Sequence, residues 1–213
     1  AIYGGTTGTL LVEGTGGLST GNTNTGIYSG NLSGVISSLG ANVVVNGTGG
    51  GLGSSTSNNG VLAGSSGGYS SAGTLTITGI GGNSTVTSDP NSANNGIFLQ
   101  GGIGLTTSAG DIFLIGTKGA NSTQGVDIFV ASTGGIANKG AISLKSLTGG
   151  FYPNNLGLSV RNESADKVTK FEDGSKLNFY IGGATRSGAT AGQYFPFQVK
   201  GLIDLNNVEL KIL

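Results

Sequence analysis

The sequence predicts an all-β fold: a right-handed parallel β-helix (β-solenoid) of about six rungs, each with roughly 33 residues and three short strands. Three observations predict it. An alternating apolar run recurs at a nearly constant spacing, two further apolar motifs recur once in each of the same periods, and no segment has helical periodicity. An antiparallel sandwich is the alternative, but its repeats would not keep three strand types in fixed order. The right hand follows from the general preference of parallel crossovers.

The first motif is an alternating apolar run that ends on a glycine. The closing glycines are Gly14, Gly47, Gly79 and Gly116, spaced 33, 32 and 37 residues apart. The runs before them are residues 9–13, 42–46, 74–78 and 111–115, and residues 141–145 continue the series after a shorter step. We expect every second side chain of each run, such as Leu75 and Ile77, to point into the bore. The closing glycines then mark the register of the stack, and the glycine-rich segment after each run is expected to bend through positive φ.

Two further motifs recur between the copies of the first. The second motif comprises residues 26–28, 60–62 and 96–98, with weaker echoes at 127–130 and 157–160. The third comprises residues 34–38, 68–71 and 102–107. Each period therefore holds three candidate strands, separated by segments rich in Gly, Ser, Asn and Thr.

An asparagine lies two residues before the glycine of the second motif in several periods, namely Asn24, Asn58, Asn94 and, at the weaker echo, Asn155. Stacked asparagine side chains can hydrogen-bond along a ladder and satisfy the backbone of buried turns. The alternative is that asparagine is simply common in turns, where it tolerates left-handed geometry. These four asparagines, together with the four closing glycines, are the predicted structural register residues.

The character of the chain changes after residue 150. Residues 1–150 hold the regular repeats, whereas residues 151–213 contain thirteen of the twenty charged residues and longer aromatic-bearing runs. Strands are expected at 176–181, 194–199 and 202–213. We interpret this third as irregular rungs and a terminal unit of the same solenoid, because end repeats are usually atypical. The charged segment 161–176 is interpreted as a solvated loop or insertion, with a functional site as the alternative.

Composition removes several classes of function. The chain has no His and no Cys, which excludes triads built on imidazole or thiolate and the usual zinc sites. Ten acidic and ten basic residues give zero net charge, so no electrostatic footprint for nucleic acid exists. No apolar run is long enough to span a membrane as a helix. A disordered linker is disfavoured because hydrophobic residues make up 36% of the chain and arrive in alternating bursts.

No catalytic, cofactor-binding or metal-binding residue is predicted, and no enzyme activity or cofactor. The alternative is a polysaccharide-binding or polysaccharide-degrading β-helix protein, similar to a lyase or glycosidase, which would need carboxylates on one face. The candidates for that role are Asp111, Asp127, Asp166, Glu172 and Asp173. Asp127 reads as an ordinary outward surface charge. An ice-binding face is the least favoured reading, because the Thr74–Thr78 run has no threonine counterparts in the other rungs.

The Gly-Thr-Gly-Gly motif and the Asn94-Asn95-Gly96-Ile97-Phe98 motif resemble the repeats of large bacterial exoproteins. These are the filamentous-haemagglutinin-like and autotransporter-like adhesins of Gram-negative bacteria, and the likeness covers roughly residues 1–150. The resemblance implies an extracellular structural or adhesive module, located at the cell surface and associated with the outer membrane. It also implies a subunit or fragment of a fibre or adhesin, and makes cell-surface glycans a candidate partner.

The ends of a solenoid predict a second kind of partner. The backbone groups of a terminal rung point along the axis with nothing to pair them. Residues 1–4 offer no amphipathic cap, and the chain closes on an alternating run, residues 208–213. We therefore expect at least one end to be occupied by another copy or by further rungs of a longer chain. The alternative is that residues 151–200 fold over an end.

Overall fold

The computed structural model confirms the predicted fold class. It describes residues 1–30, 35–64, 68–85, 93–101, 104–107, 110–122, 125, 127–132, 136–137, 141–146, 151–153, 169–170, 176–181, 203–204 and 209–212. All regular elements in this part of the chain are β-strands, and none is a helix. Every strand pairing between them is parallel. The protein is a parallel β-solenoid.

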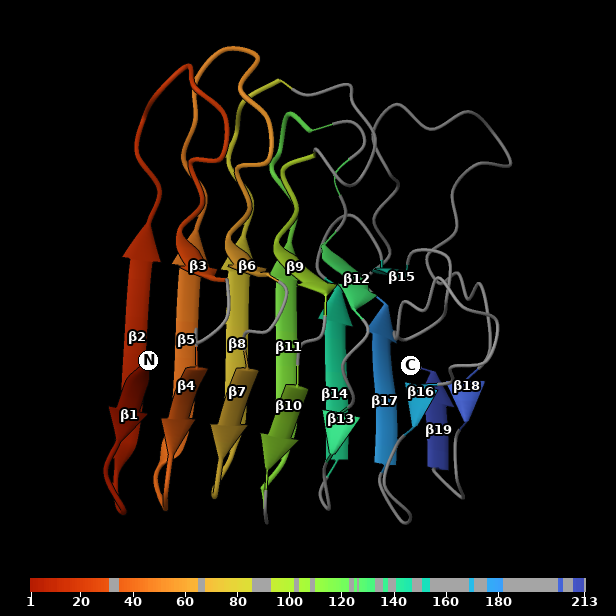
Figure 1. The fold of residues 1–213 in the computed structure, drawn as a ribbon. Coiled ribbons are helices and arrows are strands. Elements are labelled where there is room, and N and C mark those ends of the chain that lie inside the picture. The colour runs from red at the N-terminus through yellow and green to blue at the C-terminus, as the bar shows by residue number, and fades with distance from the viewer. Residues whose placement is uncertain are drawn as a thin grey trace.

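Each of the first five coils gives one strand to each of three sheets (Figure 1). Sheet A contains β1 (Ile2–Gly4), β4 (Val35–Ser38), β7 (Gly68–Ser71), β10 (Gly104–Thr107) and β13 (Ile136–Ala137). Sheet B contains β2 (Thr9–Thr15), β5 (Asn42–Thr48), β8 (Leu75–Ile80), β11 (Ile112–Thr117), β14 (Ala141–Ser146), β17 (Lys176–Ile181) and β19 (Glu209–Ile212). Sheet C contains β3 (Ile27–Ser29), β6 (Val61–Ala63), β9 (Ile97–Gly101), β12 (Ile128–Ser132) and β15 (Phe151–Pro153).

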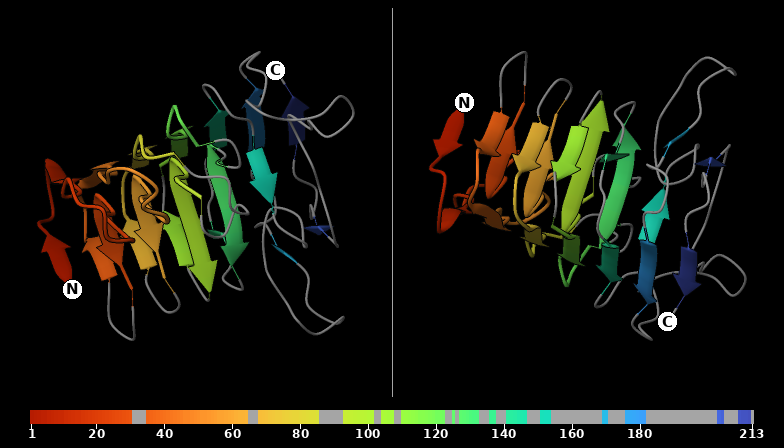
Figure 2. Two further views of the ribbon diagram at one scale, coloured as in Figure 1. Left: turned by 90° about the horizontal axis from the view of Figure 1, so that it is seen from above. Right: turned by 90° about the horizontal axis from the view of Figure 1, so that it is seen from below.

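Among the described residues, five coils therefore contribute to all three sheets, and sheet B continues to seven strands. We number the coils from the N-terminus, so that coil 1 holds β1, β2 and β3. A separate pair, β16 (Thr169–Lys170) and β18 (Ile203–Asp204), lies toward the C-terminal end. The views from above and below place the first coil at one end of the stack and β19 at the other (Figure 2).

The strands stack in the register that the repeat predicts. In sheet B, Gly14 pairs with Gly47, Gly47 with Gly79, and Gly79 with Gly116. In sheet A, Ile36 pairs with Tyr69, which pairs with Leu105. Because side chains alternate between the two faces of a strand, equal registers place like residues above one another in columns.

The core is a set of apolar columns inside the three sheets. Leu75, Ile77, Ile112 and Leu114 are fully buried, in agreement with the predicted inward positions of sheet B. The inward residues of sheet C, such as Ile97, join the same cluster. The bore is therefore filled by side chains from all three walls, and adding a coil lengthens the core without widening it.

The C-terminal third extends these sheets beyond residue 150. The expected strand at 176–181 is β17, and it pairs with β14. Within the expected run 202–213, the described residues are the short strands β18 and β19, which belong to different sheets. In sheet C the strand that pairs with β12 is β15 at residues 151–153, where the sequence suggested 157–160. Residues 157–160, the expected strand 194–199 and the charged residues Asp166, Glu172 and Asp173 lie outside the described residues.

Candidate functional site

The closing glycines of sheet B lie where the chain turns the corner toward sheet C and two backbone segments approach each other closely. A Cβ atom on Gly79 would press on the carbonyl oxygen of Gly96 and would lie 2.6 Å from its carbonyl carbon. The corresponding distances are 2.7 Å from Gly47 to the carbon of Gly60 and 2.6 Å from Gly116 to the carbon of Asp127. Since both partners are backbone atoms, no rotamer change can relieve such a contact. Any side chain at these positions would push the two sheets apart.

This contact corrects the predicted role of these glycines. The positive φ expected of the glycine-rich segments is absent at all four closing glycines. Among the described glycines it occurs at Gly8, Gly51 and Gly53, of which Gly51 directly follows the second Gly-Thr-Gly-Gly motif. The register glycines keep φ values that other residues also adopt. Glycine is required there because of close backbone approach, which is its other common use.

Asparagine side chains form a hydrogen-bonded ladder along the same corner. The backbone N–H and the Nδ2 of Asn24 donate to Oδ1 of Asn58, over 2.9 and 3.0 Å. Asn58 donates in the same way to Oδ1 of Asn94, over 3.0 and 3.1 Å. In coil 4 the acceptor is Ser122, whose Oγ accepts from the backbone N–H of Asn94. The ladder thus has a direction, with each coil donating to the next, and Asn155 lies outside the described residues.

The ladder is buried and supported by serines. Asn58 and Asn94 have no exposed surface, and Ser55 and Ser84 are also buried. Nδ2 of Asn58 donates to Ser55 and Ser84, and Nδ2 of Asn94 donates to Ser84. Buried polar groups are costly unless they are paired, so this network stabilises the corner only while it is complete.

Coil 4 places two charged residues at positions that hold glycine in the coils before it. By register, Lys118 stands at the position of Gly81, and Asp127 stands at the position of Gly96. Both are buried, so the expected surface position of Asp127 is wrong. Oδ1 of Asp127 accepts a 2.7 Å hydrogen bond from the backbone N–H of Lys118, and Nζ of Lys118 donates to the carbonyl of Ser122. These charges hold the corner of coil 4 together inside the protein.

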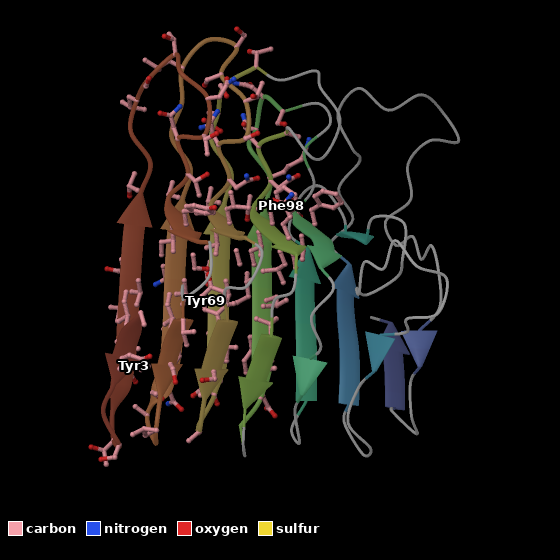
Figure 3. The ribbon with its side chains drawn as sticks, in the orientation of Figure 1. Tyr3, Tyr69 and Phe98 are labelled. Carbon is pink, nitrogen blue, oxygen red and sulfur yellow. The ribbon has the colours of Figure 1, made fainter. Side chains whose placement is uncertain are left out.

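A tyrosine hydroxyl lies inside the bore. Tyr69 is fully buried among the inward residues of sheet A, and a 2.6 Å hydrogen bond joins its hydroxyl to Oγ of Ser29 (Figure 3). Burial raises the pKa of Tyr69 from 10.0 to about 12, while the bond to Ser29 acts in the opposite direction. The folded protein therefore holds this proton more tightly than the unfolded chain does.

We expect this proton to make stability depend on alkaline pH. Between pH 10 and pH 12 the unfolded chain loses the proton and the folded state keeps it, so the free energy of unfolding falls as pH rises. The difference between pKa 10.0 and about 12 corresponds to roughly 3 kcal/mol. Urea unfolding of the wild type and of Tyr69→Phe measures it. The wild type should be the more stable at pH 8 and should lose that advantage by pH 12; an advantage equal at both pH values would contradict this cause.

The outer face of sheet C carries a second apolar column, which the sequence analysis did not identify. Tyr28, Leu62, Phe98 and Phe129 pair in register on this face. Leu62, Phe98 and Phe129 form a buried cluster outside the bore, with the rings of Phe98 and Phe129 4.7 Å apart. The sequence carries a signal for this column, because the third residue of the second motif is a large apolar or aromatic residue in the copies at 26–28, 60–62, 96–98 and 127–130. At the end of the column, Tyr28 is exposed.

The outer surface of the first coils offers little charge. Before residue 111 the only charged side chains are Glu13 and Asp89. Among the described residues no group of three or more acidic side chains could hold a metal ion. In the same part of the chain, no helix is long and apolar enough to cross a membrane. The contacts that the described residues make are therefore contacts between neighbouring coils of the solenoid.

Fold and contacts together define a β-solenoid whose coils are locked by backbone contact at glycine and by an asparagine ladder. Comparison with known proteins does not assign the chain to a particular family of β-solenoids. No family model, no curated protein and no solved structure matches the chain.

Proposed function

We propose that the chain is an extracellular structural or adhesive module, part of a cell-surface fibre or adhesin of a Gram-negative-type bacterium. In this role the solenoid is a stiff spacer that presents other parts of the assembly. The observation that supports the proposal is that the repeated residues are used for stacking: glycines at backbone contacts, asparagines in the ladder and apolar residues in columns. Each further coil adds about 4.8 Å of length to such a rod.

The surface fits the same role. The first 110 residues hold only two charged side chains, so this part of the chain has no electrostatic attraction for nucleic acid or for an anionic membrane. Continuous parallel sheets also resist bending, because each inner coil is hydrogen-bonded to the coils on both sides. The resemblance to secreted adhesin repeats points to the same location.

Protease treatment of intact cells that produce the protein tests the location. A protease that cannot enter the cell should remove the protein from the surface, while a cytoplasmic marker stays intact. Recovery of the full amount only after lysis would contradict the proposal. Binding of the isolated protein to a glycan array separates the two roles: specific binding favours an adhesin, and its absence favours a fibre component.

A further inference from the structure

We propose that the Asn59-Gly60 dipeptide is a latent deamidation site, which coil 3 keeps closed while the solenoid is folded. When coils 2 and 3 stay apart, the site reacts and the chain can no longer restore the stack. The inference concerns a covalent modification, so it does not depend on the proposed extracellular role. It is carried by the identity of the two residues, by their burial and by two hydrogen bonds to one residue of the next coil.

The packing of this corner selects a chemically labile dipeptide. Gly60 directly precedes strand β6 (Figure 1), and a Cβ atom on it would press on the backbone nitrogen of Ile80 and lie 2.7 Å from the carbonyl carbon of Gly79. Only glycine fits such a close backbone approach. Asparagine followed by glycine deamidates more readily than other asparagine dipeptides, because no side chain on the second residue hinders the attack of its backbone nitrogen.

The reaction joins two groups that are neighbours in the chain. The backbone nitrogen of Gly60 attacks Cγ of Asn59, and the new N–Cγ bond closes a succinimide ring. The Cγ–Nδ2 bond breaks, and the amide leaves as ammonia with the proton that the backbone nitrogen has lost. Water then opens the ring at either carbonyl and leaves aspartate or isoaspartate. Deamidation therefore needs a free N–H on Gly60, a free side-chain amide on Asn59 and access for water.

Asn95 of coil 3 holds both reacting groups. The N–H of Gly60 donates to the carbonyl oxygen of Asn95 over 3.0 Å, and the N–H of Asn95 donates to Oδ1 of Asn59 over 3.1 Å. Nδ2 of Asn59 is also engaged, since it donates to the carbonyl of Ser57 over 3.2 Å. Asn59 and Asn95 have no exposed surface, so water does not reach the amide. Separation of coil 3 from coil 2 releases both groups together.

The isoaspartate product no longer fits the stack. Its main chain runs through the former side chain, which inserts a methylene group into the backbone directly before β6. Strand β6 pairs in register with β9, and the longer backbone displaces it from that register. On the other side, the carbonyl of Asn59 accepts from the N–H of Gly26 in coil 1, so the change disturbs both neighbouring coils. Chemical change of the opened chain makes unfolding irreversible.

Peptide mapping by mass spectrometry tests the protection. The protein is incubated at alkaline pH in buffer and, in parallel, in urea above its unfolding midpoint. Conversion of Asn59 should be about tenfold slower or more in the folded protein, because only molecules with separated coils react. In urea Asn58 is the control and should react more slowly than Asn59, since asparagine and not glycine follows it. Equal rates at Asn59 with and without urea, or no reaction in urea, would overturn the proposal.

Refolding tests the consequence of the reaction. Chains kept in urea are returned to buffer, and a protease removes the chains that do not refold. Isoaspartate at position 59 should be depleted from the protease-resistant chains. An equal share of isoaspartate before and after digestion would contradict the irreversible step.

Asn59→Thr is the matched variant for this experiment. Coil 1 carries Thr25 at the same register position, and Oγ1 of Thr25 donates to the carbonyl of Ser57 as the amide of Asn59 does. Threonine therefore suits this corner and has no amide to lose. After equal times in urea, a larger share of Asn59→Thr than of the wild type should regain the native circular dichroism spectrum. Equal shares for the two proteins would overturn the role of Asn59.

Discussion

Gly79→Ala is expected to lower the free energy of unfolding by about 3 kcal/mol or more, and Gly79→Val is expected to prevent folding. The added Cβ would lie 2.6 Å from the carbonyl carbon of Gly96, and the opposing atoms are backbone. Relief requires the corner between sheets B and C to open. Because Gly47 and Gly116 lie directly beside Gly79 in register, the opening would disturb the coils on both sides. Urea unfolding followed by circular dichroism measures the loss.

Two other glycines serve as controls for this prediction. Nothing lies closer than 4.0 Å to a Cβ built on Gly5, so Gly5→Ala should change stability by less than about 0.5 kcal/mol. Gly53 has open space but a φ of 59°, so Gly53→Ala should cost about 1 kcal/mol from backbone strain alone. An unfolding midpoint of Gly79→Ala equal to that of Gly5→Ala would contradict the close contact.

Asn58→Ala is expected to destabilise the protein by about 3 kcal/mol. The substitution removes the acceptor of Asn24 and the amide that donates to Ser55 and Ser84. These groups are mostly buried, so water cannot replace the lost partner, and each unpaired buried group costs about 1–3 kcal/mol.

Asn22→Ala is the matched control for the ladder. Oδ1 of Asn22 also accepts a hydrogen bond from the backbone of the next coil, at Thr56, but the site is exposed. Water can take over this bond, so we expect a loss below about 1 kcal/mol. Equal losses for the two variants in urea unfolding would show that the buried ladder adds nothing beyond an ordinary turn.

The repeat allowed the register of the fold to be predicted because in-register stacking demands equivalent residues at equivalent positions. The spacing of Gly14, Gly47 and Gly79 gave the pairing of sheet B, and the spacing of Asn24, Asn58 and Asn94 pointed to the ladder. The reason for the glycines was not readable from the sequence. Positive φ and close backbone approach both require glycine, and only the three-dimensional structure distinguishes these two causes.

Other features were missed for identifiable reasons. Asp127 was interpreted as an outward surface charge, but it is buried in coil 4, where it accepts a hydrogen bond from the backbone N–H of Lys118; the sequence pattern does not show this contact. Strand β1 was not predicted because it is only three residues long, and it is identified as a strand by its pairing with β4. The buried cluster on the outer face of sheet C depends on segments that cover it, and a strand pattern alone does not show which face is covered.

Disulfide cross-linking tests the parallel stack most directly, because the chain contains no cysteine of its own. Val44 and Thr76 are register partners on the outer face of sheet B. Adjacent strands lie about 4.8 Å apart, within the Cα separation that a disulfide bridges. Val44→Cys with Thr78→Cys is the control: Thr78 lies on the same face, two residues further along, which puts the two Cα atoms about 8 Å apart, beyond that reach. Under mild oxidation, peptide mapping should find the 44–76 bond and no 44–78 bond; equal yields, or a preference for 44–78, would contradict the proposed register.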